Sequence, residues 1–519
     1  MIQKTELAPG MLKEVPDRQR REILAGMRWT LWLSVICAPL GYLTTVLLAR
    51  VGPQAIGTYG LLSLYISLTS VFLFFGGNGV AIKFLPELEP GKRASFLASY
   101  FFVIIAATLP YQIAASLWPK GLKYILGSEV SESFGVLLIW LAPMYILFSL
   151  VLAALKGLLE IKWAQIYNRV ITLGSFGIYG VLFFFARPSL TAHYSAIIWW
   201  VYFGLTLFVM LLAMRRLLSS LGEKLFSRPS LRFSLPRGFW RYTLGLQSNS
   251  ILDFLNNRVD YIFILNVAGL AVFGRYVALL TLVSVIPIFA TFVLDSLLPS
   301  LTNTLASKDY RAARQLTETY LRFILPCGML AATFATLFAR FVFSILGSKY
   351  ADLAGLGLVT FPVAAVQVLN WFAGTMLTAI GEPHRATAGK ATRCIVFCIA
   401  FWPLWHRYNL LGAILAWGIG ETVDQIVLLI MLLHKTPFRF SWVPTYSAFL
   451  ASVCLSAAAA ASLGDNRPLA SAGIWIGLIA FFFLVARYSL SEVRELAHLV
   501  LPASLSAAIL SPTPRSTEL

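Results

Sequence analysis

The feature that most constrains this chain is a series of apolar runs, each about twenty residues long, that recurs along its length. An α-helix rises about 1.5 Å per residue, so about twenty apolar residues cross the roughly 30 Å hydrocarbon core of a bilayer. We expect about fourteen such helices, which leave no intervening stretch long enough for a folded extramembrane domain. The predicted fold class is an all-α polytopic membrane protein.

The expected helices group into two sets of six and a final pair. Their first residues lie near Trp29, Tyr59, Ala94, Phe134, Ala164, Thr191, Tyr242, Val272, Tyr320, Ala354, Ala391, Leu410, Pro444 and Ala470. The predicted divisions are a cytoplasmic segment (1–28), a first six-helix bundle (29–214), a basic cytoplasmic linker (215–241), a second six-helix bundle (242–434), two additional helices (435–490) and a cytoplasmic tail (491–519). The apolar spacing of the tail fits either an interfacial helix or a frayed end.

Charge is scarce and unevenly placed. Only 12% of the residues are charged and 58% are apolar, whereas a soluble globular chain carries about 25% charge. The net charge of +18 would suit a nucleic-acid binder, but most of the 41 Lys and Arg residues fall on one side of the expected helices. This positive-inside pattern argues against a nucleic-acid partner. It predicts a multi-pass protein of the bacterial inner membrane with both termini in the cytoplasm.

The sequence offers no set of residues typical of an enzyme. It contains no glycine-rich phosphate loop, no paired Cys or His spacing and no GxSxG motif. The five cysteines lie in or beside apolar segments, where thiols usually behave as small hydrophobic groups. We therefore expect neither catalysis, nor a bound metal, nor a cofactor.

An internal repeat relates the two expected bundles. Gly52, Gly57 and Tyr59 recur as Gly269, Gly274 and Tyr276 at one offset of 217 positions. The tetrad 125–128 recurs as 345–348, and a proline at 143 recurs at 362. Each glycine alone fits a helix cap. The shared order instead indicates duplication, and hence two parallel bundles related by an axis along the membrane normal, flanking a cleft suited to alternating access.

Around these residues the chain resembles the polysaccharide transporters, including O-antigen flippases, of the multidrug/oligosaccharidyl-lipid/polysaccharide (MOP) flippase superfamily. The resemblance rests on four stretches: LLARVGPQAIGTYG, LNNRVDYIFILNVAGLAVFGRY, SILGSKYADLAG and AIGEPHRATAGK. It implies a V-shaped, MATE-like pair of bundles that moves an undecaprenyl-pyrophosphate-linked oligosaccharide between leaflets. The first helix departs from the arginine-rich pattern expected of peptidoglycan-precursor flippases.

The seventh expected helix holds the densest set of polar residues. At about 100° per residue, five of them fall within an arc of about 100°, and one basic residue lies opposite. These residues are Asn249, Asp253, Asn256, Asn257 and Asp260, with Arg258 opposite. A polar stripe at this depth must face protein or water. It predicts one of two arrangements. The stripe is either a cavity wall that binds sugar hydroxyls, a coupling cation (H⁺ or Na⁺) or both, or it forms hydrogen bonds between helices.

The twelfth expected helix carries two acidic residues on one face, Glu421 and Asp424. Depths counted along the helices allow Glu421 to pair with Arg258. A structural ion pair and a gating pair both fit the sequence. We include both carboxylates in the candidate cavity.

A pyrophosphate group requires basic donors near the cleft. The candidates are Lys156, Lys162 and Arg169 on the expected inner side, and Arg50 and Arg275 on the outer side. Basic residues beside helix ends also bind lipid phosphate or set topology. Both interpretations apply to all five residues.

The predicted function is a flippase or exporter of a lipid-linked oligosaccharide for surface polysaccharide synthesis. Its expected partners are that substrate, membrane lipids, a coupling H⁺ or Na⁺, and polysaccharide polymerases or glycosyltransferases. The alternative is a cation-coupled, MATE-type exporter of small amphipathic molecules.

The charge asymmetry predicts that the basic linker is cytoplasmic. A reporter enzyme fused after Arg228 should therefore give a cytoplasmic signal, as should fusions at either terminus. An external signal after Arg228 would reverse the orientation of the whole chain.

Overall fold

The computed structural model describes residue 33 and residues 36–118, 132–221, 235–438, 443–463 and 468–488. Helices make up nearly all of this part of the chain, and it contains no β-strand, which confirms the all-α fold class. The expected cytoplasmic segment, much of the basic linker and the tail lie outside the described residues.

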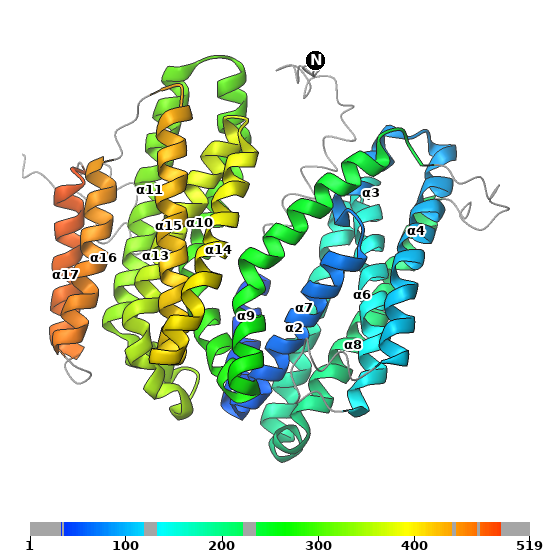
Figure 1. Ribbon diagram of the computed structural model, residues 1–519, viewed down its shortest axis with the longest axis horizontal. Helices are drawn as coiled ribbons and strands as arrows, with labels where there is room; N and C mark the ends of the chain where they lie inside the picture. The colour runs from blue at the N-terminus through cyan, green and yellow to red at the C-terminus, as the bar shows by residue number, and fades with distance from the viewer. Residues whose placement is uncertain are drawn as a thin grey trace, which may run out of the picture. The chain divides into compact units, whose positions relative to one another are not determined.

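Figure 1 shows the order of the helices in the described part of the chain. They are α2 (Pro53–Leu73), α3 (Gly77–Glu87), α4 (Pro90–Leu117), α6 (Glu132–Gly157), α7 (Ile161–Phe185), α8 (Arg187–Leu221), α9 (Phe239–Val283), α10 (Val285–Ala306), α11 (Tyr310–Leu337), α12 (Ala339–Ser344), the 3₁₀ helix η1 (Ser348–Leu353), α13 (Ala354–Ala379), α14 (Pro383–Tyr408), α15 (Leu410–Lys435), α16 (Val443–Leu463) and α17 (Pro468–Val485). A shorter apolar helix, Ile36–Val51, precedes α2.

Eleven helices of the described part are long and apolar enough to cross a membrane. Helix α9, with 45 residues, contains a break at Gly269, whose φ of 76° favours glycine. The expected helices that begin near Tyr242 and Val272 therefore count as one among these eleven. The expectation of about fourteen membrane helices is not confirmed, although the fold is that of a multi-pass membrane protein.

Helices α11 and α14 begin well before the expected residues, α14 at Pro383 instead of near Ala391, because their first turns are polar. Helix α11 begins at Tyr310, ten positions before the expected residue, and the Asp309 side chain caps it by accepting from the backbone N–H of Ala312 at 3.0 Å. Arg314 and Glu318 pair at 3.0 Å in this polar stretch. A search for apolar runs misses such a start, since the helix continues beyond its membrane-spanning part.

A break that the sequence analysis did not predict separates α2 from α3. Gly76 and Gly77 have φ values of 72° and 57°, a region in which only glycine is free of a steric penalty. The chain bends there within what was expected to be one helix, beginning near Tyr59.

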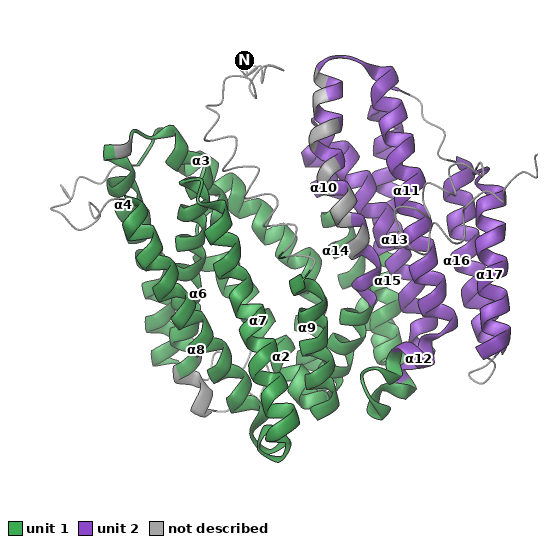
Figure 2. Cartoon of the chain, turned by 180° about the vertical axis from the view of Figure 1, so that it is seen from behind, with its two compact units in different colours: residues 1–282, 343–352, 390–420 green, residues 283–342, 353–389, 421–519 purple. Residues whose placement is uncertain are grey.

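The chain forms two compact units, coloured in Figure 2. Unit 1 comprises residues 1–282, 343–352 and 390–420, and unit 2 comprises residues 283–342, 353–389 and 421–519. Helices α14 and α15 each pass from one unit to the other. The units do not follow the boundaries of the two expected six-helix bundles, and the division into bundles stays a prediction.

The core of unit 1 lies between α3, α4, α6 and the start of α9. Phe239 places its ring 6.1 Å from Phe84, 6.4 Å from Phe96 and 5.7 Å from Tyr100, all centroid to centroid. These rings anchor the first turn of α9. In unit 2, α10 packs on α11 and α13, and α11 packs on α16, which packs on α17.

In unit 1, α2 crosses α9 with the two backbones in direct contact, and the contact uses the repeated glycines. A Cβ at Gly57 would meet the carbonyl oxygen of Leu270, and a Cβ at Gly274 would meet that of Pro53. Leu270 stands 217 positions after Pro53, as Gly274 stands after Gly57. The glycine of each copy of the motif therefore contacts the equivalent backbone carbonyl of the other copy. This exchange is the pattern of a two-fold contact and supports the repeat.

The crossing predicts a destabilising effect for Gly274→Ala. The added methyl group must displace the start of α2, at a cost of about 1–3 kcal/mol. The midpoint of thermal unfolding of the purified protein in detergent should fall. Gly245→Ala, in the same helix but with open space around it, should leave the midpoint unchanged or raise it slightly; equal effects of both changes would contradict the close crossing.

Candidate functional site

The polar stripe expected in the seventh helix lies in α9, before the break at Gly269. The structure divides it into two faces. Asn249, Asp253 and Asn257, at steps of four residues, are exposed, whereas Asn256 and Asp260 are buried. The single predicted stripe thus meets two environments.

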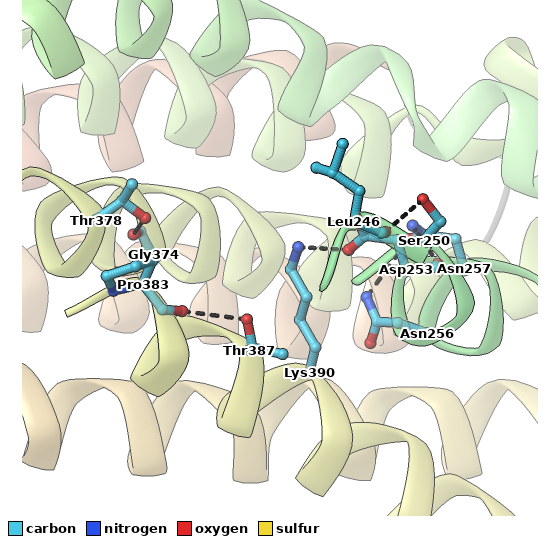
Figure 3. Close-up of polar contacts among 10 residues, drawn as sticks. All are labelled: Leu246, Ser250, Asp253, Asn256, Asn257, Gly374, Thr378, Pro383, Thr387 and Lys390. Atoms are coloured by element: carbon cyan, nitrogen blue, oxygen red, sulfur yellow. Dashed lines mark hydrogen bonds and ion pairs between the residues drawn. The ribbon is translucent and has the colours of Figure 1, made fainter. Parts of the chain in front are cut away.

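The exposed face, shown in Figure 3, is centred on Asp253. Its carboxylate oxygen Oδ1 accepts from the Nζ of Lys390 in α14 at 2.6 Å, so an ion pair joins the two helices. The side-chain amide of Asn257 donates to the backbone carbonyl of Asp253 at 2.8 Å, and that of Asn256 approaches the Asn257 oxygen at 3.5 Å. The sequence analysis did not identify Lys390.

The buried face holds Asp260 inside unit 1. Its Oδ2 accepts from the hydroxyl of Tyr276 at 2.7 Å, and the cation of Arg393 lies near enough to attract it. Tyr276 belongs to the repeat and follows Gly269 on the far side of the break. Asp260 therefore ties together the two parts of α9, which is a structural arrangement.

Arg258 points toward α2. Its guanidinium donates to the hydroxyl of Ser63 at 3.3 Å and lies 4.7 Å from the ring centroid of Tyr261. These contacts satisfy a charged group at membrane depth by hydrogen bonding and cation–π attraction. Whether Arg258 also pairs with Glu421 stays a prediction.

Gln247 supports the break between α2 and α3, a role the sequence analysis missed. Its side-chain oxygen accepts from the backbone N–H of Gly76 at 3.1 Å, and its amide nitrogen donates to the carbonyl of Val71. Both backbone groups lose a helical partner at the break. The available signal was a polar residue on α9 two positions before Asn249.

In unit 2, Glu421 and Asp424 are buried, with exposed fractions of 0% and 4%. Glu421 accepts from the Gln367 amide at 3.2 Å and from the Asn370 amide at 2.6 Å, both on α13. A side chain at Gly389 would press on the Asp424 carboxylate. Their membership of a binding cavity stays a prediction.

The five basic candidates form two sets. At the expected inner end, Lys156 lies close enough to Arg169 for the two charges to repel, and the Nζ of Lys162 lies 5.6 Å from the Trp163 ring.

At the other end, Arg50 donates to the carbonyl of Ile345 at 3.2 Å and Arg275 pairs with Asp352. Both outer arginines thus contact the segment 343–352, which carries the second copy of the repeated tetrad.

Known structures provide a comparison. The chain superposes on the lipid II flippase MurJ, in an inward closed conformation, with a TM-score of 0.65 at 14% identity, over 88% of this chain and 98% of that one. It also superposes on an inward-facing multidrug resistance MATE transporter of the MOP superfamily, with a TM-score of 0.58 at 14% identity, over 77% and 94% of the two chains. The chain has the MOP fold.

A third superposition is with a MOP superfamily transporter from Pyrococcus furiosus, described as having a binding pocket of reversed polarity. Its TM-score is 0.54 at 15% identity, over 81% of this chain and 96% of that one. No protein-family model and no curated protein matches the sequence. The superfamily-level resemblance is thus confirmed as a likeness of fold, while the polysaccharide branch stays a prediction.

The role of Gln247 predicts a specific effect of Gln247→Leu. The change keeps the side-chain size but leaves the buried N–H of Gly76 and the half-buried carbonyl of Val71 without this partner, at a cost of up to about 1–3 kcal/mol each. Thermal stability should fall and hydrogen exchange should rise at residues 71–77. Ser250→Ala, which removes only a bond to Leu246 of the same helix, is the control; unchanged exchange at the break in Gln247→Leu would refute the bracing role.

Proposed function

We propose that this protein is a flippase that moves an undecaprenyl-pyrophosphate-linked oligosaccharide across the bacterial inner membrane for surface polysaccharide synthesis. It works as a transporter and catalyses no reaction. Polysaccharide polymerases or glycosyltransferases act before or after it on the same lipid-linked substrate.

The observation that carries this proposal is the exposed ladder Asn249, Asp253 and Asn257 in the middle of a membrane-length helix. A charged group facing lipid at this depth would cost about 2.5–3.5 kcal/mol or more, so the ladder faces water during transport. Amide and carboxylate groups donate to and accept from hydroxyl groups. A row of them suits a sugar chain.

The basic candidates supply the rest of the substrate's chemistry. Lys156, Lys162 and Arg169 receive the pyrophosphate on the cytoplasmic side, and Arg50 and Arg275 meet it on the outer side. The electrostatic repulsion between Lys156 and Arg169 supports this assignment, because an anion bound between the two cations would offset it. Glu421 and Asp424 respond to a coupling H⁺ or Na⁺.

A MATE-type exporter of small amphipathic molecules is the second candidate, supported by the likeness of fold to multidrug transporters. The ion pair of Asp253 with Lys390 favours the flippase. A cationic drug approaching Asp253 would meet the positive charge of Lys390, whereas an anionic headgroup would be attracted by it.

Deletion of the gene separates the two functions. A flippase mutant should lose a surface glycan and accumulate lipid-linked repeat units on the inner leaflet. An exporter mutant should keep its glycan and retain more of a cationic dye. Normal surface glycan together with raised dye retention would reject the flippase.

Asp253→Asn should stop glycan export while the protein remains folded and inserted. The amide keeps the shape and removes only the charge, so the loss of export, about tenfold or more or at least about 1.4 kcal/mol, measures the need for the carboxylate. Glu89→Gln, which breaks an exposed ion pair at the start of α4, is the matched control. Normal export by a stably expressed Asp253→Asn protein would assign the stripe to packing alone.

A further inference from the structure

Asp253 lies deep in the membrane-length part of α9, and its partner Lys390 lies in the polar first turns of α14. Asp253 is about 21 Å from the start of α9 at Phe239, and Lys390 is about 10 Å from the start of α14 at Pro383, at 1.5 Å per residue. By contrast, the pair of Lys92 with Glu89 lies at the first turn of α4. Charges at such depth are functional candidates.

The pair is easily opened. The exposed fractions of the Lys390 and Asp253 side chains are 43% and 52%, and ion pairs of such exposure contribute little to stability. The carboxylate bonds Lys390 through one oxygen at 2.6 Å. The remaining Nζ protons can contact a second anion without movement of either helix.

The surroundings of Lys390 favour an anion that carries sugar. Asn249 and Asn257 lie on the same exposed face of α9 as Asp253, one turn to either side of it. A phosphate or pyrophosphate group carries more charge and more acceptor oxygens than one carboxylate, so it competes with Asp253 for the lysine. The Asn249 amide and the remaining acceptor capacity of the Asn257 oxygen, whose amide nitrogen bonds the Asp253 carbonyl, suit the hydroxyl groups of the attached sugar.

We propose that Lys390 binds the phosphate group of the lipid-linked substrate. Before the substrate binds, Asp253 pairs with Lys390; the phosphate displaces Asp253 on binding, and Asp253 later displaces the phosphate. This inference rests on the proposed function and adds a residue and a mechanism to it. On arrival, the substrate's phosphate takes the ammonium of Lys390 from Asp253. When the carboxylate recaptures the ammonium, the phosphate is released, so the site is never left with an unpaired lysine.

The exchange and a structural salt bridge predict different effects of the two substitutions on substrate affinity. If the pair only held α9 to α14, removing either partner would have the same effect on substrate binding. In an exchange, removing Lys390 weakens binding of the phosphate, whereas removing the Asp253 charge strengthens it because the competitor is gone.

The test is a binding titration of the purified full-length protein in lipid nanodiscs, with native mass spectrometry as the readout of bound ligand. The probes are undecaprenyl pyrophosphate, its uncharged counterpart undecaprenol, and inorganic pyrophosphate. The variants are Lys390→Met, Lys390→Arg and Asp253→Asn, with Lys92→Met as the matched control, each checked for its thermal unfolding midpoint.

Lys390→Met should weaken binding of undecaprenyl pyrophosphate by about tenfold or more, as expected for loss of a charged hydrogen bond. Asp253→Asn should tighten it by about threefold or more, and Lys390→Arg and Lys92→Met should stay near the wild type. Undecaprenol should bind all variants equally. Inorganic pyrophosphate should rank the variants in the same order of affinity as undecaprenyl pyrophosphate does. It should bind each of them more weakly, because it lacks the lipid.

Equal shifts of Lys390→Met and Asp253→Asn in one direction, or no shift in Lys390→Met, would overturn the exchange while leaving the flippase function standing. A wild-type protein that prefers undecaprenol, or binds neither lipid, would instead contradict the proposed function as well. If Lys390→Met does not fold, Asp253→Asn decides alone, since weaker or unchanged binding in that variant contradicts the competition.

Discussion

The crossing of α2 and α9 brings a glycine of each helix against a backbone carbonyl of the other, with no side chain between them. Any larger residue at Gly57 or Gly274 would push the helices apart. Leu270 and Gly274 follow the break at Gly269, so the crossing holds the second part of α9 against α2. The hydrogen bond from Tyr276 to Asp260 connects that part to the polar residues before the break, which thereby keep a fixed rotation relative to α2. Arg258 reaches Ser63, and the opposite face turns Asp253 toward Lys390.

The same fixed rotation explains why one polar stripe has two roles. Asp260 and Asn256 are buried and serve the integrity of α9, through Tyr276 in the case of Asp260. Asp253, less than two turns earlier, remains exposed and pairs with a residue of another helix. Two carboxylates of one helix thus have different partners according to the face on which they lie: Asp260 bonds a residue of its own helix and Asp253 a residue of another.

The sequence was sufficient to predict the fold class, because apolar length and charge asymmetry follow from the bilayer itself. It also identified the crossing glycines through their common offset. It did not predict the break at Gly76, since two glycines inside an apolar run have no distinctive spacing. The polar starts of α11 and α14 were missed for the opposite reason, because a search for apolar runs passes over charged turns.

For the candidate site, helical periodicity placed five polar residues within one arc but could not separate its exposed edge from its buried edge. That separation depends on which neighbours pack beside α9. Lys390 was missed because its partner lies 137 positions away, and nothing local in its sequence distinguishes it from an interfacial lysine. The amide partners of Glu421 on α13 are distant in the same way.

The amide of Gln247 at the break between α2 and α3 has an electrical consequence. It holds the break by one donated and one accepted hydrogen bond, carries no net charge and does not titrate. Membrane voltage therefore exerts no net force on this joint, and acidification does not loosen it. A single charge moved across the membrane, by contrast, exchanges about 2.3 kcal/mol per 100 mV. Helix α9 thus contributes an uncharged brace to the joint between α2 and α3 and, less than two turns further on, one partner of a charged pair.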